Sequence, residues 1–323
     1  MRKILSMCYL CLILSFILPL FLERGEDPPA VPEETPFENK PLPSPAAPAG
    51  EMIKLLAGGE ILEIPMEEYL LGVLAAEMPA SFPEEALRAQ SVAARSYTLY
   101  CASLNKHGTA QVCADPGCCQ AWADSSDLVR RWGDKAAYYR ARMEKALQAT
   151  AGEYLAYDGK AICAAFHSSS AGTTEYSASI WNPTPYLVSV DSPETAERVP
   201  ELVSYAWLSP GDFAAGLCSL HPEFAPSSDP EDWIEAVQYS EGGRVNSVRI
   251  CALDFTGAEL RGLFALRSTD FQLVYDGSGF AFTVFGYGHG VGMSQYGAKL
   301  MAEDGADYRE ILSHYYPGTS LMA

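Results

Sequence analysis

The spacing of apolar and polar residues after Pro65 predicts two helices separated by a break. Apolar side chains recur every three or four residues over 66–77, and Pro65 suits the start of a helix. Pro79 ends this helix, because the residue before a proline is pushed out of the α region. The second helix is predicted to start with a capping box from Ser81 to Glu84. Its small residues, which permit close packing, are Ala86, Ala89, Ala93 and Ser96.

One acidic side chain, Glu77, falls in the last turn of the first helix. The negative end of the helix dipole disfavours a carboxylate there and raises its pKa, and helices ordinarily place Lys or Arg at this point. We therefore interpret Glu77 as a candidate catalytic acid. The alternative is an ordinary surface carboxylate at a helix end. On the second helix, Arg88 and Arg95 are seven residues apart and share one face.

The remaining chain shows strand and helix patterns bounded by turn signals. They are a hairpin over 51–65 about Gly58-Gly59, a helix over 134–150, a hairpin about Asp158-Gly159, a short helix over 212–217, and a final helix capped by Asp307 and Glu310. Strands prevail from about 185 to 285. These patterns predict an α+β fold in which a helical part carrying Glu77 packs on a strand-rich, largely antiparallel part, with a cleft between them.

An apolar run over 4–22 is long enough to span about 30 Å of hydrocarbon. Arg2 and Lys3 precede it, acidic residues follow it, and no small-residue cleavage pattern marks its end. We therefore predict an uncleaved anchor over 1–22, single-pass in the cell membrane, with the rest of the chain outside the cytoplasm. A removable signal peptide is the alternative.

Composition separates the rest of the chain into a linker and a domain. Residues 23–50 are rich in Pro and acidic side chains, which is typical of a semi-rigid extended spacer, and 51–323 is predicted to fold. The 323 residues are 48% apolar and 20% charged, ordinary values for a globular protein. A net charge of -19 argues against sequence-independent binding to nucleic acid, which requires a basic surface.

Four side chains that bind zinc well gather within a short segment around the turn signal Asp115-Pro116-Gly117. They are His107, Cys113, Cys118 and Cys119. Disulfides are the alternative, because the predicted location permits them. Adjacent cysteines are poorly placed to bridge each other, however, and disulfides would leave the histidine without a role. We favour zinc, and four protein ligands make the metal structural rather than catalytic.

Two polar loops carry further candidate chemistry. His167 precedes three serines, but the G-x-S-x-G elbow of serine hydrolases is missing and no acidic third member is evident. Hydrogen bonding to a hydroxyl-rich ligand is therefore the better interpretation. The second loop has glycine at every other position over 286–292, which differs from a dinucleotide loop and lets backbone approach a ligand or another strand. His289 within it is either structural or a substrate contact.

Several long segments in one order resemble the stage II sporulation protein D family, also called the SpoIID/LytB domain. They are EEYLLGVLAAEMPASFPEEALRAQSVAARSY, AFHSSSAGTTE, IWNPTPYLVSV, LRSTDF, GYGHGVGMSQYGA and ILSHYYPGT. The resemblance implies a membrane-anchored lytic transglycosylase that cuts peptidoglycan glycan strands, stripped of stem peptides, to 1,6-anhydromuramic ends. It also implies a role in sporulation and engulfment, on the forespore-facing side, beside a stage II sporulation protein P-type amidase/endopeptidase. A non-catalytic wall-binding or amidase-modifying module of the LytB type is the alternative.

The resemblance also implies roles for individual residues. The family's catalytic glutamate falls on Glu77, and its basic positions fall on Arg88 and Arg95. Zinc-binding relatives use two histidines and two cysteines, so Cys118 occupies a histidine position. The residues expected to line the glycan groove are Arg88, Gln90, Arg95, His167, Ser168, Ser169, Ser170, Tyr176, His289 and Gln295.

Overall fold

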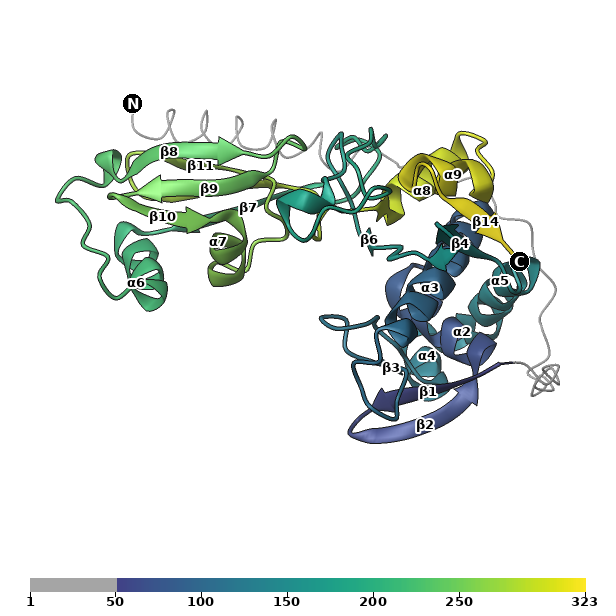
Figure 1. The fold of residues 1–323 in the computed structure, drawn as a ribbon. Coiled ribbons are helices and arrows are strands. Elements are labelled where there is room, and N and C mark those ends of the chain that lie inside the picture. The colour runs from purple at the N-terminus through teal and green to yellow at the C-terminus, as the bar shows by residue number, and fades with distance from the viewer. Residues whose placement is uncertain (1–50) are drawn as a thin grey trace, which may run out of the picture. The chain divides into compact units, whose positions relative to one another are not determined.

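The computed structural model describes residues 51–323, which begin with a hairpin and two helices (Figure 1). The helices are α2 (Met66–Glu77) and α3 (Glu84–Ser103), as predicted, and Met78 between them is extended. The predicted capping box is wrong, since Pro83 is the N-cap of α3 and no side chain caps this helix. Because the residue before Pro83 cannot easily be helical, the helix begins only after the proline.

Helix α3 lies at the centre of the first hydrophobic core. It packs against α2, α5 (Ala136–Ala149), α8 (Gln295–Glu303) and α9 (Tyr308–Tyr315). All four of its predicted small residues are fully buried, so neighbouring helices approach its backbone closely. Each fully buried aliphatic side chain of α2, such as Leu70, Val73 or Leu74, contributes roughly 1.5–3 kcal/mol.

Small sheets surround these helices. Their strands are β1 (Met52–Ala57), β2 (Glu60–Pro65), β3 (Val112–Cys113), β4 (Tyr154–Tyr157), β5 (Lys160–Ala161) and β14 (Ser320–Met322), and α4 (Ser125–Trp132) and a 3₁₀ turn precede α5. Both predicted hairpins are confirmed: β1 pairs with β2, and β4 with β5. The turn residues Asp158 and Gly159 have φ of 48° and 72°, as a type I′ turn requires.

The strand-rich part has its own core. One antiparallel sheet has the order β11-β12-β7 and the other β10-β9-β8. Their elements are β7 (Val203–Leu208), β8 (Ile234–Tyr239), β9 (Val245–Ile250), β10 (Leu253–Thr256), β11 (Phe271–Tyr275) and β12 (Phe280–Phe285), with α6 (Pro210–Leu220) and α7 (Gly257–Leu263). Phe213 and Phe280 stack within this core at 4.0 Å between ring centroids. The predicted α+β class is therefore confirmed, with the sheets beginning at 203 rather than 185.

Short loop pairings join the helical elements to the strand-rich part. Strand β6 (Phe166–His167) pairs in parallel with β13 (Met293–Ser294), and single bridges join Ser169 to Tyr287 and Glu175 to Val291. The chain leaves the helical core after β6 and returns to it through β13. Glu77 lines none of the three cavities that we describe in residues 51–323, so the predicted cleft stays a prediction.

The predicted localisation, single-pass in the cell membrane, is wrong for the part of the chain that the structure describes. None of the helices in residues 51–323 is long and apolar enough to cross a bilayer. The predicted anchor over 1–22 and linker over 23–50 lie outside the described residues. The described chain falls within one compact unit.

Candidate functional site

Glu77 is the last residue of α2 and is half-buried. Its Oε1 accepts a hydrogen bond of 2.9 Å from the backbone N–H of Ala121. Burial raises the pKa of Glu77, because a carboxylate loses solvation there, and the Ala121 N–H opposes this effect. No basic residue lies in the last turn to neutralise the charge. The carboxyl group is therefore suited to hold a proton and to donate it.

The loop that supplies Ala121 also carries the four predicted metal ligands. Their donor atoms all lie within 4.8 Å of one another, and His107 Nε2 is 3.3 Å from Cys119 Sγ and 3.7 Å from Cys118 Sγ. Zinc bonds of about 2.0–2.3 Å in a tetrahedron place neighbouring ligand atoms at comparable separations. The cysteines of the described chain are all free thiols. The donor set thus fits zinc, while zinc itself stays a prediction.

Two contacts tie this metal-ligand loop to the helices. Gln120 is buried and its Nε2 donates to Thr98 Oγ1 of α3 at 2.9 Å. The thiol of Cys101, on α3, lies beside that of Cys119. Since Ala121 follows Gln120 directly, the position of its N–H against Glu77 depends on how this loop is held.

The histidine-serine loop and the glycine loop pack directly against each other. His167 is buried, with Nε2 2.7 Å from Ser170 Oγ and Nδ1 3.3 Å from the Val291 carbonyl, and its ring centroid is 5.6 Å from that of His289. Burial holds the pKa of His167 well below 6.5, so the ring is neutral. Ser170 is fully buried, which agrees with the sequence-based rejection of a serine nucleophile.

The alternating glycines allow this close packing. A Cβ at Gly292 would lie 2.0 Å from the Ala165 carbonyl oxygen, and one at Gly288 would lie 2.8 Å from Cβ of His167. Both glycines have positive φ, 73° and 114°. The prediction that these glycines let the backbone approach another strand is confirmed by the β6–β13 pairing.

The two predicted arginines bind carboxylates within the protein. Arg88 forms ion pairs with Glu84 and Glu85, which lie in the first turn of the same helix, α3. Arg95 is buried and donates two hydrogen bonds to the carboxylate of Glu67, from Nη1 to Oε1 at 2.6 Å and from Nη2 to Oε2 at 3.1 Å. Glu67 stands in the first turn of α2, so Arg95 lies at the opposite end of that helix from the catalytic candidate. Their proposed contacts with substrate stay predictions.

Two buried glutamines have amide groups without partners in the described chain. Neither amide atom of Gln90 has a hydrogen bond, nor does Nε2 of Gln295. Unpaired buried amides are costly, about 1–3 kcal/mol each, which marks both as groups available to a ligand. Near Gln295, the N–H of Tyr296 donates to the carbonyl of half-buried Ser168, and its ring packs at 5.1 Å on Phe82. The serine loop is thereby linked to the α2–α3 break.

Aromatic side chains near the glycine loop are accessible. Trp181, which the sequence analysis did not single out, is 46% exposed and its ring lies 5.0 Å from that of His289. Tyr287 is 48% exposed, with the Arg267 guanidinium 4.9 Å above its ring. Tyr176 is half-buried. Flat amphipathic side chains of this kind suit a carbohydrate, and the motif IWNPTP was the available signal for Trp181.

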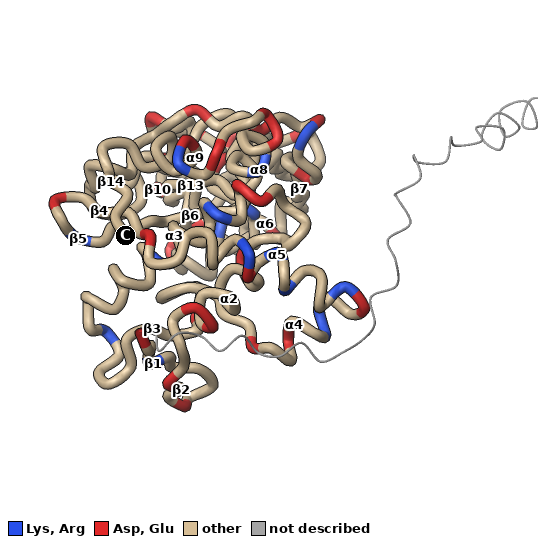
Figure 2. Tube along the Cα trace, turned by 90° about the vertical axis from the view of Figure 1, so that its right-hand side faces the viewer, with Lys and Arg blue, Asp and Glu red and all other residues tan. Residues whose placement is uncertain are grey.

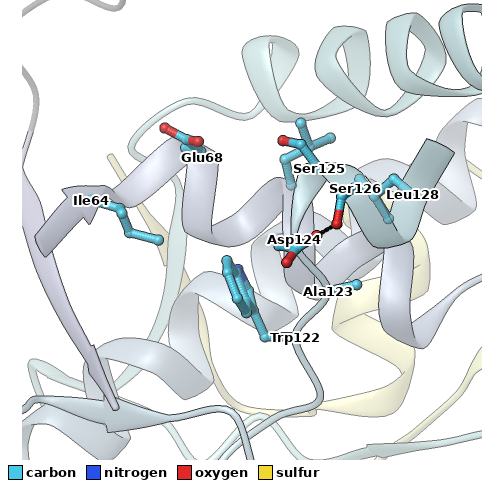
Figure 3. A pocket seen from close by; sticks show the side chains of 10 residues that line it. Ile64, Glu68, Trp122, Ala123, Asp124, Ser125, Ser126 and Leu128 are labelled. Carbon is cyan, nitrogen blue, oxygen red and sulfur yellow. Dashed lines mark hydrogen bonds between the residues drawn. The ribbon is translucent and has the colours of Figure 1, made fainter. Parts of the chain in front are cut away.

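A separate cavity of about 290 Å³ opens beside the first half of α2 (Figure 3). The indole of Trp122 stands within it, near Asp124 and opposite Glu68. Glu77 does not line it. Figure 2 shows acidic positions spread over the whole described trace, with fewer basic positions between them. The cavity is lined by apolar side chains such as Ile64 and Leu128 together with the carboxylates of Glu68 and Asp124, so it disfavours an anionic ligand.

Comparisons with known proteins agree with the motifs. The family model described as stage II sporulation protein matches residues 58–157. Stage II sporulation protein D of Bacillus amyloliquefaciens is 35% identical over 262 residues, which cover 80% of this chain and 74% of the relative. Stage II sporulation protein D of Bacillus subtilis (strain 168) is 30% identical over 330 residues, covering 98% and 93%. The amidase enhancer of the same strain is 31% identical over 304 residues, covering 79% of this chain and 40% of the relative. The chain therefore belongs to the stage II sporulation protein D (SpoIID) family.

Proposed function

We propose that this protein is a lytic transglycosylase that cleaves the glycan strands of peptidoglycan during sporulation. The observation that carries the proposal is the half-buried Glu77 at the end of α2, whose pKa burial raises. Burial raises this pKa and the Ala121 N–H opposes the effect. Ordinary glycosidases use a pair of carboxyl groups, whereas a lytic transglycosylase needs only one.

The proposed reaction uses Glu77 first as an acid and then as a base. Its carboxyl proton passes to the glycosidic oxygen as the bond from that oxygen to C1 of muramic acid breaks. The resulting carboxylate accepts the proton of the C6 hydroxyl while the C6 oxygen bonds to C1. The products are a new sugar hydroxyl and a 1,6-anhydro ring, and Glu77 regains its proton. Expected substrates are strands without stem peptides.

Substitution of Glu77 tests the proposal. Glu77→Gln keeps the shape of the side chain but has no proton to donate, so release of 1,6-anhydromuramic products should fall by about 10²–10⁴-fold. Mass spectrometry of digested glycan strands measures this release, and circular dichroism checks the fold. Glu63→Gln, at an exposed position on β2, is the control and should retain activity. Undiminished cleavage by Glu77→Gln, or products that have taken up water, would refute the assignment.

A binding role without cleavage is the second candidate, favoured by the similarity to a protein named amidase enhancer. In that case the chain would hold glycan for an amidase/endopeptidase of the stage II sporulation protein P type. The wild-type protein would then release no anhydro products from purified strands, but would raise the rate at which an added amidase releases peptides.

We also propose that His107, Cys113, Cys118 and Cys119 hold a structural zinc ion. The distances among their donor atoms support this assignment. When bound, the ion would cross-link the metal-ligand loop and leave no position for a substrate. Gln120 attaches this loop to α3 by its hydrogen bond to Thr98. The attachment positions the Ala121 N–H against Glu77.

A further inference from the structure

The outer face of one sheet in the strand-rich part carries two exposed aromatic rings. Side chains of β7 alternate between the core and solvent, and the outward ones are Tyr205, 78% exposed, and Trp207, 54% exposed. Because they are two residues apart, they share one face and are separated by roughly 7 Å along the strand. Residues opposite them on β12 and β11 complete two rows, Tyr205 with Thr283 and Gln272, and Trp207 with Ala281 and Val274. We call these six residues the aromatic face.

The indole of Trp207 is held in one orientation. Its Nε1 donates to Asp276 Oδ2 at 3.1 Å. A Cβ at Gly279 would lie 2.4 Å from Cζ2 of the indole, so the ring packs directly on the glycine backbone. The ring is thus supported on one side while about half of the residue stays accessible. An aromatic ring that is already fixed loses little conformational freedom when a ligand stacks on it.

None of the six side chains of the aromatic face is charged, although 20% of the chain is. Strand β7 ends the strand order β11-β12-β7, and edge strands ordinarily carry charged side chains that prevent pairing with other chains. Exposed apolar groups that are gathered on one face indicate a binding surface. Aromatic rings pack against the C–H groups of sugars, and polar groups such as those of Gln272 and Thr283 hydrogen-bond to sugar hydroxyls. The aromatic face therefore suits a polysaccharide.

Charge and continuity favour an uncharged glycan over a second copy of the chain. Two copies with a net charge of -19 repel each other, whereas a neutral polymer is not repelled. The sheet also adjoins the glycine loop: β12 ends at Phe285, and the N–H of Gly286 donates to the carbonyl of Leu202, just before β7, at 2.8 Å. Tyr205 is three residues from Leu202, about 10 Å for an extended chain. A linear polymer on the aromatic face can therefore reach the glycine loop.

We propose that the aromatic face is a glycan-binding site that does not include Glu77, and that it holds an uncharged, β-linked strand of N-acetylated sugars by stacking on Tyr205 and Trp207. A β-linked strand is a flat ribbon that presents successive sugar faces to a sheet, whereas an α-linked strand coils away from it. This inference rests on the proposed substrate class, a wall glycan, but not on its cleavage. Binding therefore tests it separately from catalysis.

The parent for these measurements is the full chain carrying Glu77→Gln, which prevents turnover. Calorimetry should show it binding a hexamer of β-linked N-acetylglucosamine at least about tenfold more tightly than a hexamer of α-linked glucose, which can stack on only one ring. Tyr205→Ala and Trp207→Ala should each weaken binding of the first hexamer about two- to tenfold, and the two together should weaken it further. Tyr239→Ala, which removes an equally exposed ring from β8 of the other sheet, is the matched control and should bind like the parent. Circular dichroism checks the fold of each variant.

Unchanged affinity in the double variant, or no measurable binding of the N-acetylglucosamine hexamer by the parent, overturns the proposal. Equal affinity for the two hexamers also overturns it, because a flat strand would not be selected. A double variant that changes the full chain from dimer to monomer in sedimentation, with hexamer affinity unchanged, would assign the aromatic face to a second copy instead. Loss of hexamer binding in the double variant together with absent cleavage by the wild type would uphold the site and refute only the proposed catalysis.

Discussion

Among single residues, Glu77 shows how competing effects set the chemistry of a side chain. The sequence placed it at a helix C-terminus, where the dipole raises the pKa. In the structure, burial is the larger cause of the raised pKa and the Ala121 N–H acts against it. Ala121 is 44 residues away along the chain. Sequence position could therefore predict the direction in which the pKa moves but not the group that moderates it.

The raised pKa of Glu77 predicts a pH-dependent cost to stability. Its ordinary pKa of 4.5 applies to the unfolded chain, so the folded state binds the proton more tightly. The free energy of unfolding should therefore fall as the pH rises from about 4.5 to the raised pKa, by about 1.4 kcal/mol for each pH unit between these two values. Glu77→Gln cannot ionise, so its stability relative to wild type should rise over that range.

Urea unfolding of both proteins between pH 4 and 8 measures this difference. A stability difference that shrinks as the pH rises would mean that the pKa of Glu77 is lowered.

At the level of elements, sequence reasoning succeeded where the determining contacts are local. The Asp307 and Glu310 capping box forms as predicted, because both partners lie within one turn. The sequence could not predict the β6–β13 pairing, because Phe166 and Met293 are distant along the chain and each strand has only two residues. Alternating glycines indicated a close approach without naming the strand approached.

In the candidate site, too, contacts within one segment could be predicted from the sequence, whereas contacts between distant segments could not. The four predicted metal ligands lie close together, because they belong to one loop. Arg95, by contrast, was assigned to a helix face by spacing alone, and its partner Glu67 comes from another helix. The packing of two helices, which spacing along one helix cannot reveal, decides where that charge is used.

The metal-ligand loop should depend on zinc for its order. The purified full chain should contain about one zinc ion, and removing it with a chelator should lower the thermal midpoint, by roughly 2–4 °C for each kcal/mol lost. Cys113→Ser should lose the metal. Cys218→Ser, in the strand-rich part, should keep it and serves as the control. Elemental analysis and calorimetry measure these effects, and a disulfide at Cys113 found by mass spectrometry would contradict them.

At the scale of the whole described molecule, two large hydrophobic cores and a small apolar cluster of Val199, Leu202 and Leu300 are accompanied by a group of buried charged residues. Arg244 of the strand-rich part is 2% exposed, and its Nη2 lies 3.4 Å from Ser170 Oγ. The charges of Glu175, Glu194 and Asp270 act on it. A Cβ at Gly290 would come within 2.4 Å of its guanidinium, so only glycine leaves space for this side chain.

Loss of Arg244 should therefore be severe and dependent on pH. Arg244→Gln removes the buried positive charge that acts on Glu175, Glu194 and Asp270, which should cost about 1–3 kcal/mol at pH 7.5. Burial already raises the pKa of Asp270 to about 6 although Arg244 lowers it, so this pKa should rise further in the variant. Because protonated Asp270 needs no counter-ion, the loss should be smaller at pH 5 than at pH 7.5. Urea unfolding at pH 5 and pH 7.5 measures this loss of stability.

Arg249→Gln, which breaks exposed ion pairs, is the control and should cost less than about 1 kcal/mol at either pH. An equal cost for the two variants would mean that the buried charge of Arg244 does not stabilise the fold.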